Sequence, residues 1–146
     1  MISKHFEISK FKEKANFFLF YGENEGLKLE IIKTNFKNFN KGNTYRYTEK
    51  EIITNKEIFF ESIYSKSFFE NEKLIIISDV TDKALNIIEE IIETKIEGEV
   101  FILIAKRLEK KSKIRNFFEK DKRTLTIPFY EDTSQTLATI ARKILN

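Results

Sequence analysis

The sequence predicts a three-layer α/β domain, in which helices cover both faces of a five-stranded, mainly parallel sheet. Short apolar runs alternate with segments of helical periodicity along almost the whole chain. Two of these runs, residues 74–78 and 100–105, are nearly continuous in Ile, Leu, Val and Phe. Such runs are typical of parallel strands that are buried on both faces. The 146 residues are enough for one domain with its own core.

Five segments are expected to form the sheet. The expected strands cover residues 17–21, 44–47, 74–78, 100–105 and 124–129. The segment 44–47 gives the weakest signal and directly follows the turn dipeptide Gly42-Asn43. Near the N-terminus, residues 4–8 fit either an edge strand or a short helix.

Five further segments carry apolar residues at helical spacing. The expected helices cover residues 25–39, 55–65, 82–95, 112–120 and 133–145. Four of them begin at or next to a polar residue whose side chain can accept from the free N–H groups of a first turn. These expected N-caps are Asn55, Asp82, Ser112 and Thr133.

Composition narrows the class of protein. Hydrophobic residues make up 41% and charged residues 34%, which separates the chain from disordered proteins. A net charge of +3 permits contact with nucleic acid or an acidic protein but requires neither. The absence of Cys excludes disulfides, a thiol nucleophile and a Cys-based zinc site. His5 is the single His, and we expect it to be structural or exposed.

The two ends of the chain also carry expectations. The first residues contain no apolar segment of the kind that forms a secretory signal. No apolar run approaches the ~20 residues that cross a membrane. We therefore expect a cytoplasmic protein without a membrane partner. The ending ARKILN, close behind the last expected helix, suits a domain of a longer protein, although a complete small protein could end in the same way.

The stretch FFLFYGENEGLKLEII has the strand–loop–helix order of a phosphate-binding P-loop, G-x-x-x-x-G-K-[ST]. With Gly22 as the first Gly, Lys28 takes the Lys position. Leu27 stands at the second Gly position, because Gly26 comes one residue early. Leu29 replaces the hydroxyl side chain that binds Mg²⁺. The loop is therefore a degenerate version of a nucleotide site.

Other residues weaken the nucleotide site further. Glu23 and Glu25 place negative charge where a triphosphate would lie. In the strand LIIISDV, Asp79 is followed by Val80 instead of a second acid that would activate water. We therefore expect no catalytic residue, no metal and no cofactor. In the simpler interpretation the loop forms an ordinary turn and Lys28 is solvated.

Three segments, taken in order, resemble the N-terminal domain of the delta subunit of bacterial DNA polymerase III, a clamp-loader component. They are Tyr21-Gly22-Glu23, Ser67-Phe68-Phe69 before an apolar strand, and RLEKKSK at 107–113. The resemblance covers nearly all of residues 1–146 and depends on order and spacing, not on a single motif. It implies a RecA-like AAA+ domain without ATPase activity, in agreement with the degenerate loop.

The resemblance also implies partners. They are the sliding clamp, other clamp-loader subunits and, indirectly, primed DNA. The chain would then belong to a DNA-directed DNA polymerase (nucleotidyltransferase) holoenzyme and act in DNA replication without catalysing a reaction itself. The lid and collar domains of the family have no counterpart within residues 1–146.

In the family, the segment that matches Ser67-Phe68-Phe69 inserts into a hydrophobic pocket of the ring-shaped clamp. Phe68 stands where the family has Leu, and Phe69 keeps the family's Phe. Adjacent residues on a helix do not share a face, so one core cannot easily bury both rings. An exposed apolar pair with polar neighbours is typical of a partner site. The alternative is that both rings complete the core, which is a real competitor in a chain with fifteen Phe.

Two other functions compete with clamp binding. One is an active nucleotide-binding ATPase or switch domain, against which Leu29 and Val80 argue. The other is a nucleic-acid-binding module built on the basic residues 106–123. Acidic residues dilute the charge of that segment, and a solvated helix with Phe117 and Phe118 turned inward is the simpler interpretation.

Overall fold

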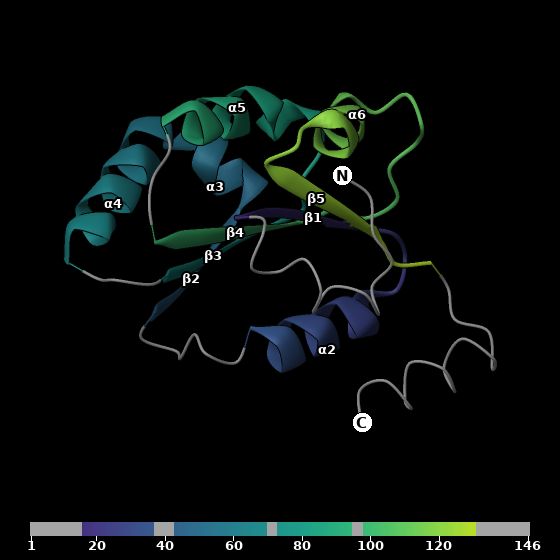
Figure 1. The fold of residues 1–146 in the computed structure, drawn as a ribbon. Helices are drawn as coiled ribbons and strands as arrows, with labels where there is room; N and C mark the ends of the chain where they lie inside the picture. Colours follow the sequence, from purple (N-terminus) through teal and green to yellow (C-terminus); the bar gives the residue numbers. More distant parts are fainter. Residues whose placement is uncertain (1–15, 37–42, 70–72, 95–97, 131–146) are drawn as a thin grey trace.

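The computed structural model describes four segments of the chain, residues 16–36, 43–69, 73–94 and 98–130 (Figure 1). They form an α/β domain around one five-stranded sheet with the order β2-β3-β4-β1-β5. Every pair of neighbouring strands is parallel. The expected helix 133–145 with its cap Thr133, and the N-terminal segment with His5, lie outside the described residues.

The five strands occupy the segments that the sequence indicates. They are β1 (Phe17–Tyr21), β2 (Thr44–Thr48), β3 (Lys73–Ser78), β4 (Glu99–Ile104) and β5 (Thr124–Pro128). No boundary differs from the expected one by more than a single residue. The strand prediction is therefore confirmed, and the sheet is wholly parallel where a mainly parallel one was expected.

The helices are α2 (Glu25–Asn35), α3 (Glu49–Thr54), α4 (Lys56–Phe69), the 3-10 turn η3 (Asp82–Ala84), α5 (Leu85–Thr94) and α6 (Lys113–Lys120). Helix α3 was not predicted. Asn55 is the C-cap of α3, directly before the first residue of α4. The N-cap of η3 is Thr81 and not Asp82, so that prediction is wrong. Ser112 caps α6 as expected and accepts from the N–H of Arg115.

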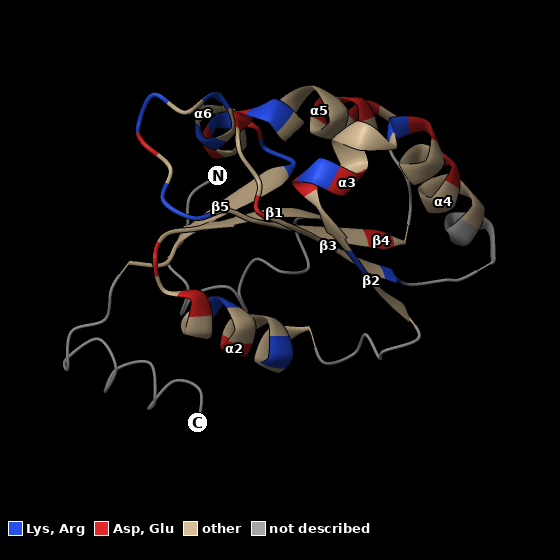
Figure 2. Cartoon of the chain, turned by 180° about the vertical axis from the view of Figure 1, so that it is seen from behind, with Lys and Arg blue, Asp and Glu red and all other residues tan. Residues whose placement is uncertain are grey.

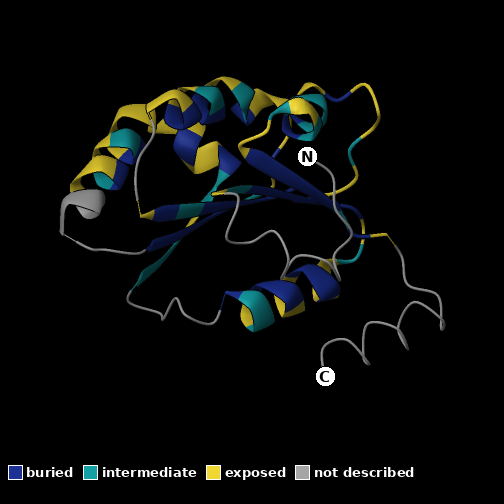
Figure 3. Ribbon diagram, in the orientation of Figure 1, coloured by how far each residue is buried: buried dark blue, intermediate teal, exposed yellow. Residues whose placement is uncertain are grey.

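The helices form a layer on each side of the sheet. Helix α2 covers one face, and α3, α4, α5 and α6 cover the other (Figure 1). Successive strand residues point to opposite faces. On β1, Phe18 and Phe20 join the core under α2, while Leu19 and Tyr21 join the core on the other side. Burial on both faces explains why β1, β3 and β4 are apolar almost without interruption, and these strands are mostly dark blue in Figure 3, whereas the edge strand β2 is only partly buried.

No helix within the described ranges is both long and apolar enough to cross a membrane.

Candidate functional site

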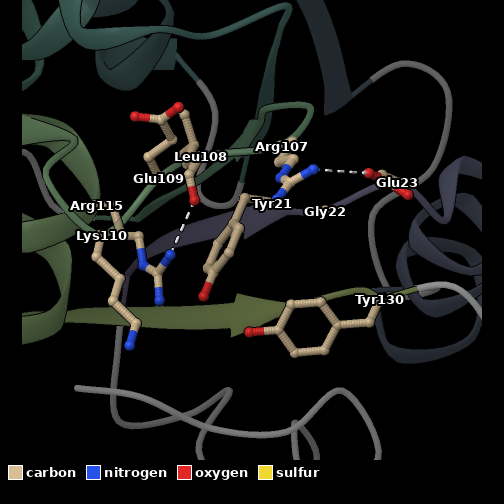
Figure 4. A pocket seen from close by; sticks show the side chains of 9 residues that line it. All are labelled: Tyr21, Gly22, Glu23, Arg107, Leu108, Glu109, Lys110, Arg115 and Tyr130. Atoms are coloured by element: carbon tan, nitrogen blue, oxygen red, sulfur yellow. Dashed lines mark hydrogen bonds and ion pairs between the residues drawn. The ribbon is translucent and has the colours of Figure 1, made fainter.

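The chain leaves β1 and β4, which are neighbours in the sheet, toward opposite faces. Beyond β1 it enters α2 under the sheet, and beyond β4 it enters α6 above the sheet (Figure 1). Parallel α/β sheets bind their ligands at such a switch point, outside the carboxyl ends of the strands. A cavity of about 660 Å³ lies there, within the usual size range of ligand pockets. Its lining residues are Tyr21, Gly22, Glu23, Arg107, Leu108, Glu109, Lys110, Arg115 and Tyr130 (Figure 4).

Gly22 holds the turn between β1 and α2 in a conformation that needs glycine. Its φ angle is +120°, and an added Cβ would lie 2.0 Å from the carbonyl oxygen of Phe129. Its own N–H donates to the carbonyl oxygen of Lys106 at 3.0 Å. The expected turn at Gly22 is therefore present. Gly26 shows no comparable restriction, because an added Cβ would meet only the side-chain oxygen of Asn24, at 4.0 Å.

Lys28 is completely buried, so the expectation that it is solvated is wrong. Its ammonium group donates to the carbonyl oxygens of Gly22 at 2.6 Å and Ala105 at 2.7 Å. It also pairs with the Glu25 carboxylate at 2.8 Å. A lysine ammonium has three donors, and all three have acceptors within the chain. Lys28 thus stabilises the loop from inside, and its charge is already compensated.

Several backbone N–H groups of the loop are engaged as well. The N–H of Asn24 donates to the carbonyl oxygen of Phe129 at 3.2 Å. Asn24 is also the N-cap of α2, and its side chain accepts from the N–H of Leu27 at 3.1 Å. These are the kind of donors that hold phosphate in a working P-loop. Leu29, at the metal-binding hydroxyl position, is 57% exposed and offers no ligand.

The end of β3 does not supply an acidic pair. Asp79 is exposed and has a φ angle of +57°. Val80 turns into the core, and its N–H donates to the carbonyl oxygen of Ile104 at 3.0 Å. An apolar side chain therefore fills the position from which a second acid would activate water. Within the described ranges no group of three or more His, Cys, Asp or Glu side chains is arranged to hold a metal ion.

Arg115 and Tyr21 form one wall of the cavity. The guanidinium of Arg115 lies 4.8 Å from the centroid of the Tyr21 ring, a cation–π distance. Its Nη1 donates to the carbonyl oxygen of Leu108 at 2.8 Å, and its Nε donates to Glu119 at 2.9 Å. Burial raises the pKa of Tyr21, and the hydrogen bond with Tyr130 raises it further. The Tyr21 hydroxyl therefore stays protonated at neutral pH.

Burial alone would lower the pKa of Arg115, but its hydrogen bond to Glu119 and the nearby Tyr21 raise that pKa by more. The guanidinium is consequently a permanent cation with a fixed orientation. Sequence reasoning did not single out Arg115 or Tyr130. The spacing of Arg115 and Glu119, one helical turn apart, was a signal for the first, whereas nothing in the local sequence marked the second.

The segment 106–123 divides into two parts. Residues 106–111 form the largely exposed loop between β4 and α6, which is rich in Lys and Arg (Figure 2). On α6, Phe118 is buried and Phe117 packs against the core, as expected. The basic charge is therefore concentrated in the loop beside the cavity.

Ser67, Phe68 and Phe69 belong to the last turn of α4. Their side chains lie outside the described residues, so their expected role stays a prediction. The end of α4 leads toward the first residue of β3, which places it at the amino edge of the sheet. The cavity is at the carboxyl edge. The two candidate regions are thus at opposite ends of the domain.

No protein-family model matches this chain, and the comparison with curated proteins gives no significant match.

Proposed function

We propose that this chain is a non-catalytic clamp-loader domain, similar to the N-terminal domain of the delta subunit of DNA polymerase III. It binds the sliding clamp through Phe68 and Phe69, with Ser67 beside them, and helps to open it during DNA replication. The observation that carries the non-catalytic part is the engagement of Lys28 by three acceptors of its own chain. A lysine held in this way does not neutralise a bound triphosphate.

The fold supports a RecA-like AAA+ domain with a degenerate nucleotide site. The order β5-β1-β4-β3-β2 puts the strand that precedes the loop between the fourth and fifth strands. The dinucleotide-binding and flavodoxin-like sheets have other orders, so the strand order speaks against both of these alternatives. Leu29 and Val80 stand where an active member of that class has a metal ligand and an acid.

Helical spacing supports an exposed aromatic pair at the end of α4. Ile63 is buried, whereas Ile58 is 63% exposed and Glu61 is exposed. Position 69 follows Ile58 by eleven residues, and position 68 follows Glu61 by seven. Both separations are close to whole numbers of helical turns. Positions 68 and 69 thus share the helical phase of exposed residues of α4, which agrees with a role of this segment in binding a partner.

Opening of the clamp requires no chemistry in this domain. Burial of each aromatic ring in a clamp pocket is worth about 1.5–3 kcal/mol, the magnitude of an interface hot spot. A domain that binds the open clamp better than the closed clamp shifts the equilibrium toward the open form. ATP-binding partner subunits would control when this surface is available.

The test is a titration of the full chain against the sliding clamp, with wild type, the double variant Phe68→Ala plus Phe69→Ala, and the control Leu29→Ala. Leu29 is an exposed apolar residue on α2, on the other face of the sheet. We expect the double variant to weaken binding by roughly a hundredfold and the control to bind as wild type does. Circular dichroism checks the fold of each variant.

Two results contradict the proposal. Equal affinity of the double variant and wild type would remove the aromatic pair from the interface. Unfolding of the double variant would show that the rings belong to the core, in which case single Phe→Leu variants that keep the fold would bind the clamp normally.

A further inference from the structure

The cavity at the switch point has hydrogen-bond donors that the chain itself leaves available. Arg115 uses one Nη1 hydrogen and its Nε hydrogen within the chain. Its other N–H groups have no acceptor among the residues that the structure describes. The hydroxyl ends of Tyr21 and Tyr130 point toward one another beside it (Figure 4). The hydrogen bond between the two tyrosines uses the O–H of Tyr21, so the wall presents the hydroxyl of Tyr130 and the fixed cation of Arg115.

Two further cations stand at the rim of the cavity. The side chain of Arg107 is 81% exposed, and Lys110 is exposed in the same loop. Acidic side chains are present too, but each has a cationic neighbour. Glu23 lies 3.9 Å from Arg107, and Glu109 lies 3.4 Å from Lys111. The cavity lining thus has three cations, Arg107, Lys110 and Arg115, against the two carboxylates of Glu23 and Glu109, an excess of one positive charge. Such an excess favours an anion, and an Arg fork suits phosphate in particular.

An exposed aromatic ring lies beside these cations. Tyr130 is 64% exposed at the edge of the cavity. An exposed ring beside a basic groove is the arrangement by which proteins stack nucleic-acid bases. The cavity volume of about 660 Å³ is also in the range of pockets that hold a ligand larger than a single phosphate.

We propose that this cavity binds one nucleotide unit, with its phosphate against Arg107, Lys110 and Arg115 and its base on the ring of Tyr130. The mode differs from that of a P-loop, because Lys28 and the N–H groups of Asn24 and Leu27 are already engaged and no metal ligand is required. The bound nucleotide is either a free mononucleotide or one nucleotide of a single-stranded nucleic acid. The proposal does not rest on clamp binding, since the aromatic pair of α4 is at the opposite edge of the sheet.

The experiment measures fluorescence anisotropy of the full chain with a labelled oligothymidylate of about 12 nucleotides, within the usual site size for single strands. AMP and inorganic phosphate serve as competitors. The cavity variant is Arg107→Ala plus Lys110→Ala. Its matched control, Lys120→Ala plus Lys122→Ala, removes the same charge from exposed positions near the amino edge of the sheet. Tyr130→Ala tests the stacking ring.

We expect the cavity variant to weaken oligonucleotide binding at least tenfold and to lower the salt dependence, while the control changes affinity less than threefold. Tyr130→Ala should weaken binding of the oligonucleotide and AMP but leave phosphate binding unchanged. If AMP competes at a concentration similar to that of the nucleotide units in the oligonucleotide, the natural ligand is a free nucleotide. If the oligonucleotide binds and AMP does not, the ligand is a single strand.

The inference is overturned if neither AMP nor the oligonucleotide binds, or if the control pair weakens binding as much as the cavity pair. A wild-type chain that binds the clamp but neither AMP nor the oligonucleotide would refute this inference and leave the proposed function standing. The same variants titrated against the clamp keep the two results apart.

Discussion

The ammonium nitrogen of Lys28 lies 2.7 Å from the carbonyl oxygen of Ala105, 77 positions further along the chain. Lys28 is in the first turns of α2, and Ala105 directly follows β4. One side chain thus joins the two connections that diverge at the switch point. It does so while fully buried, which makes its hydrogen bonds important for stability.

Replacement of Lys28 by Met should destabilise the domain by roughly 3 kcal/mol, because the carbonyl oxygens of Gly22 and Ala105 would lose a buried donor. The measurement is urea unfolding followed by circular dichroism. Lys33→Met, at an exposed position of the same helix, is the control and should change the free energy of unfolding by less than about 0.5 kcal/mol. Equal effects of the two substitutions would contradict the internal role of Lys28.

The two glycines of the loop should respond in opposite directions to Ala. Gly22→Ala should destabilise the domain by more than about 2 kcal/mol, because of the positive φ and the backbone of Phe129. Gly26→Ala, in the first turn of α2 with no contact closer than 4.0 Å for the added Cβ, should stabilise the domain by up to about 1 kcal/mol. Thermal unfolding of both variants measures the difference. A neutral Gly22→Ala would refute the close approach of the two loops.

Lys73 and Glu99 form an ion pair of 3.3 Å with both side chains fully buried, opposite one another on β3 and β4. Glu99→Ala should destabilise the domain by roughly 3–5 kcal/mol, because it leaves a buried ammonium without its carboxylate. The double variant Lys73→Met plus Glu99→Leu should regain most of that loss. Urea unfolding of the single and double variants measures the coupling. Additive losses would show that the two side chains do not act as a pair.

Asp82 gives the domain a dependence on acid pH. Burial raises the pKa of its carboxyl, but hydrogen bonds from the N–H of Ile114 and the hydroxyl of Ser112 lower it by more, so the net shift is downward from 3.8. A lowered pKa in the folded state stabilises the fold above the unfolded pKa, and this stabilisation is lost as the pH falls through the folded pKa.

Asp82→Asn should therefore destabilise the domain by roughly 1 kcal/mol at pH 7, the usual effect of a lost helix cap. The difference between wild type and variant should shrink as the pH falls below 3.8. Unfolding curves at pH 7 and at a pH below 3.8 check this. Glu61→Gln, on the exposed side of α4, is the control. A difference that stays constant with pH would exclude the carboxylate as its source.

Part of the site could be predicted from the sequence. The turn at Gly22 was predicted and is present, whereas the interpretation of the loop as a degenerate phosphate loop stays a prediction. The burial of Lys28 could not be predicted from the sequence, because one of its acceptors, the carbonyl oxygen of Ala105, lies directly after β4. Likewise, Asp82 stands at the start of its own helical turn in the sequence, but its carboxylate accepts from the first turn of α6. The assignment of Phe68 and Phe69 to the clamp stays a prediction.

Helix α3 shows why a short element escaped prediction. It has six residues, and its first one, Glu49, is buried with a carboxylate that accepts from the N–H and the hydroxyl of Thr81. These contacts join residues 32 positions apart. No local pattern records them, so a segment with little periodicity of its own was assigned to no helix.

The sequence by itself determined the central strands and most of the helices, because burial on two faces requires unbroken apolar runs and burial on one face requires a helical period. The edge strand β2, which is only partly buried, was indicated by the turn dipeptide before it. Only the tertiary structure decided the order of the strands. That order brings β1, the loop after β4, α6 and the residue beyond β5 around one cavity. Such a meeting depends on contacts between distant segments, and periodicity along the chain contains no information about them.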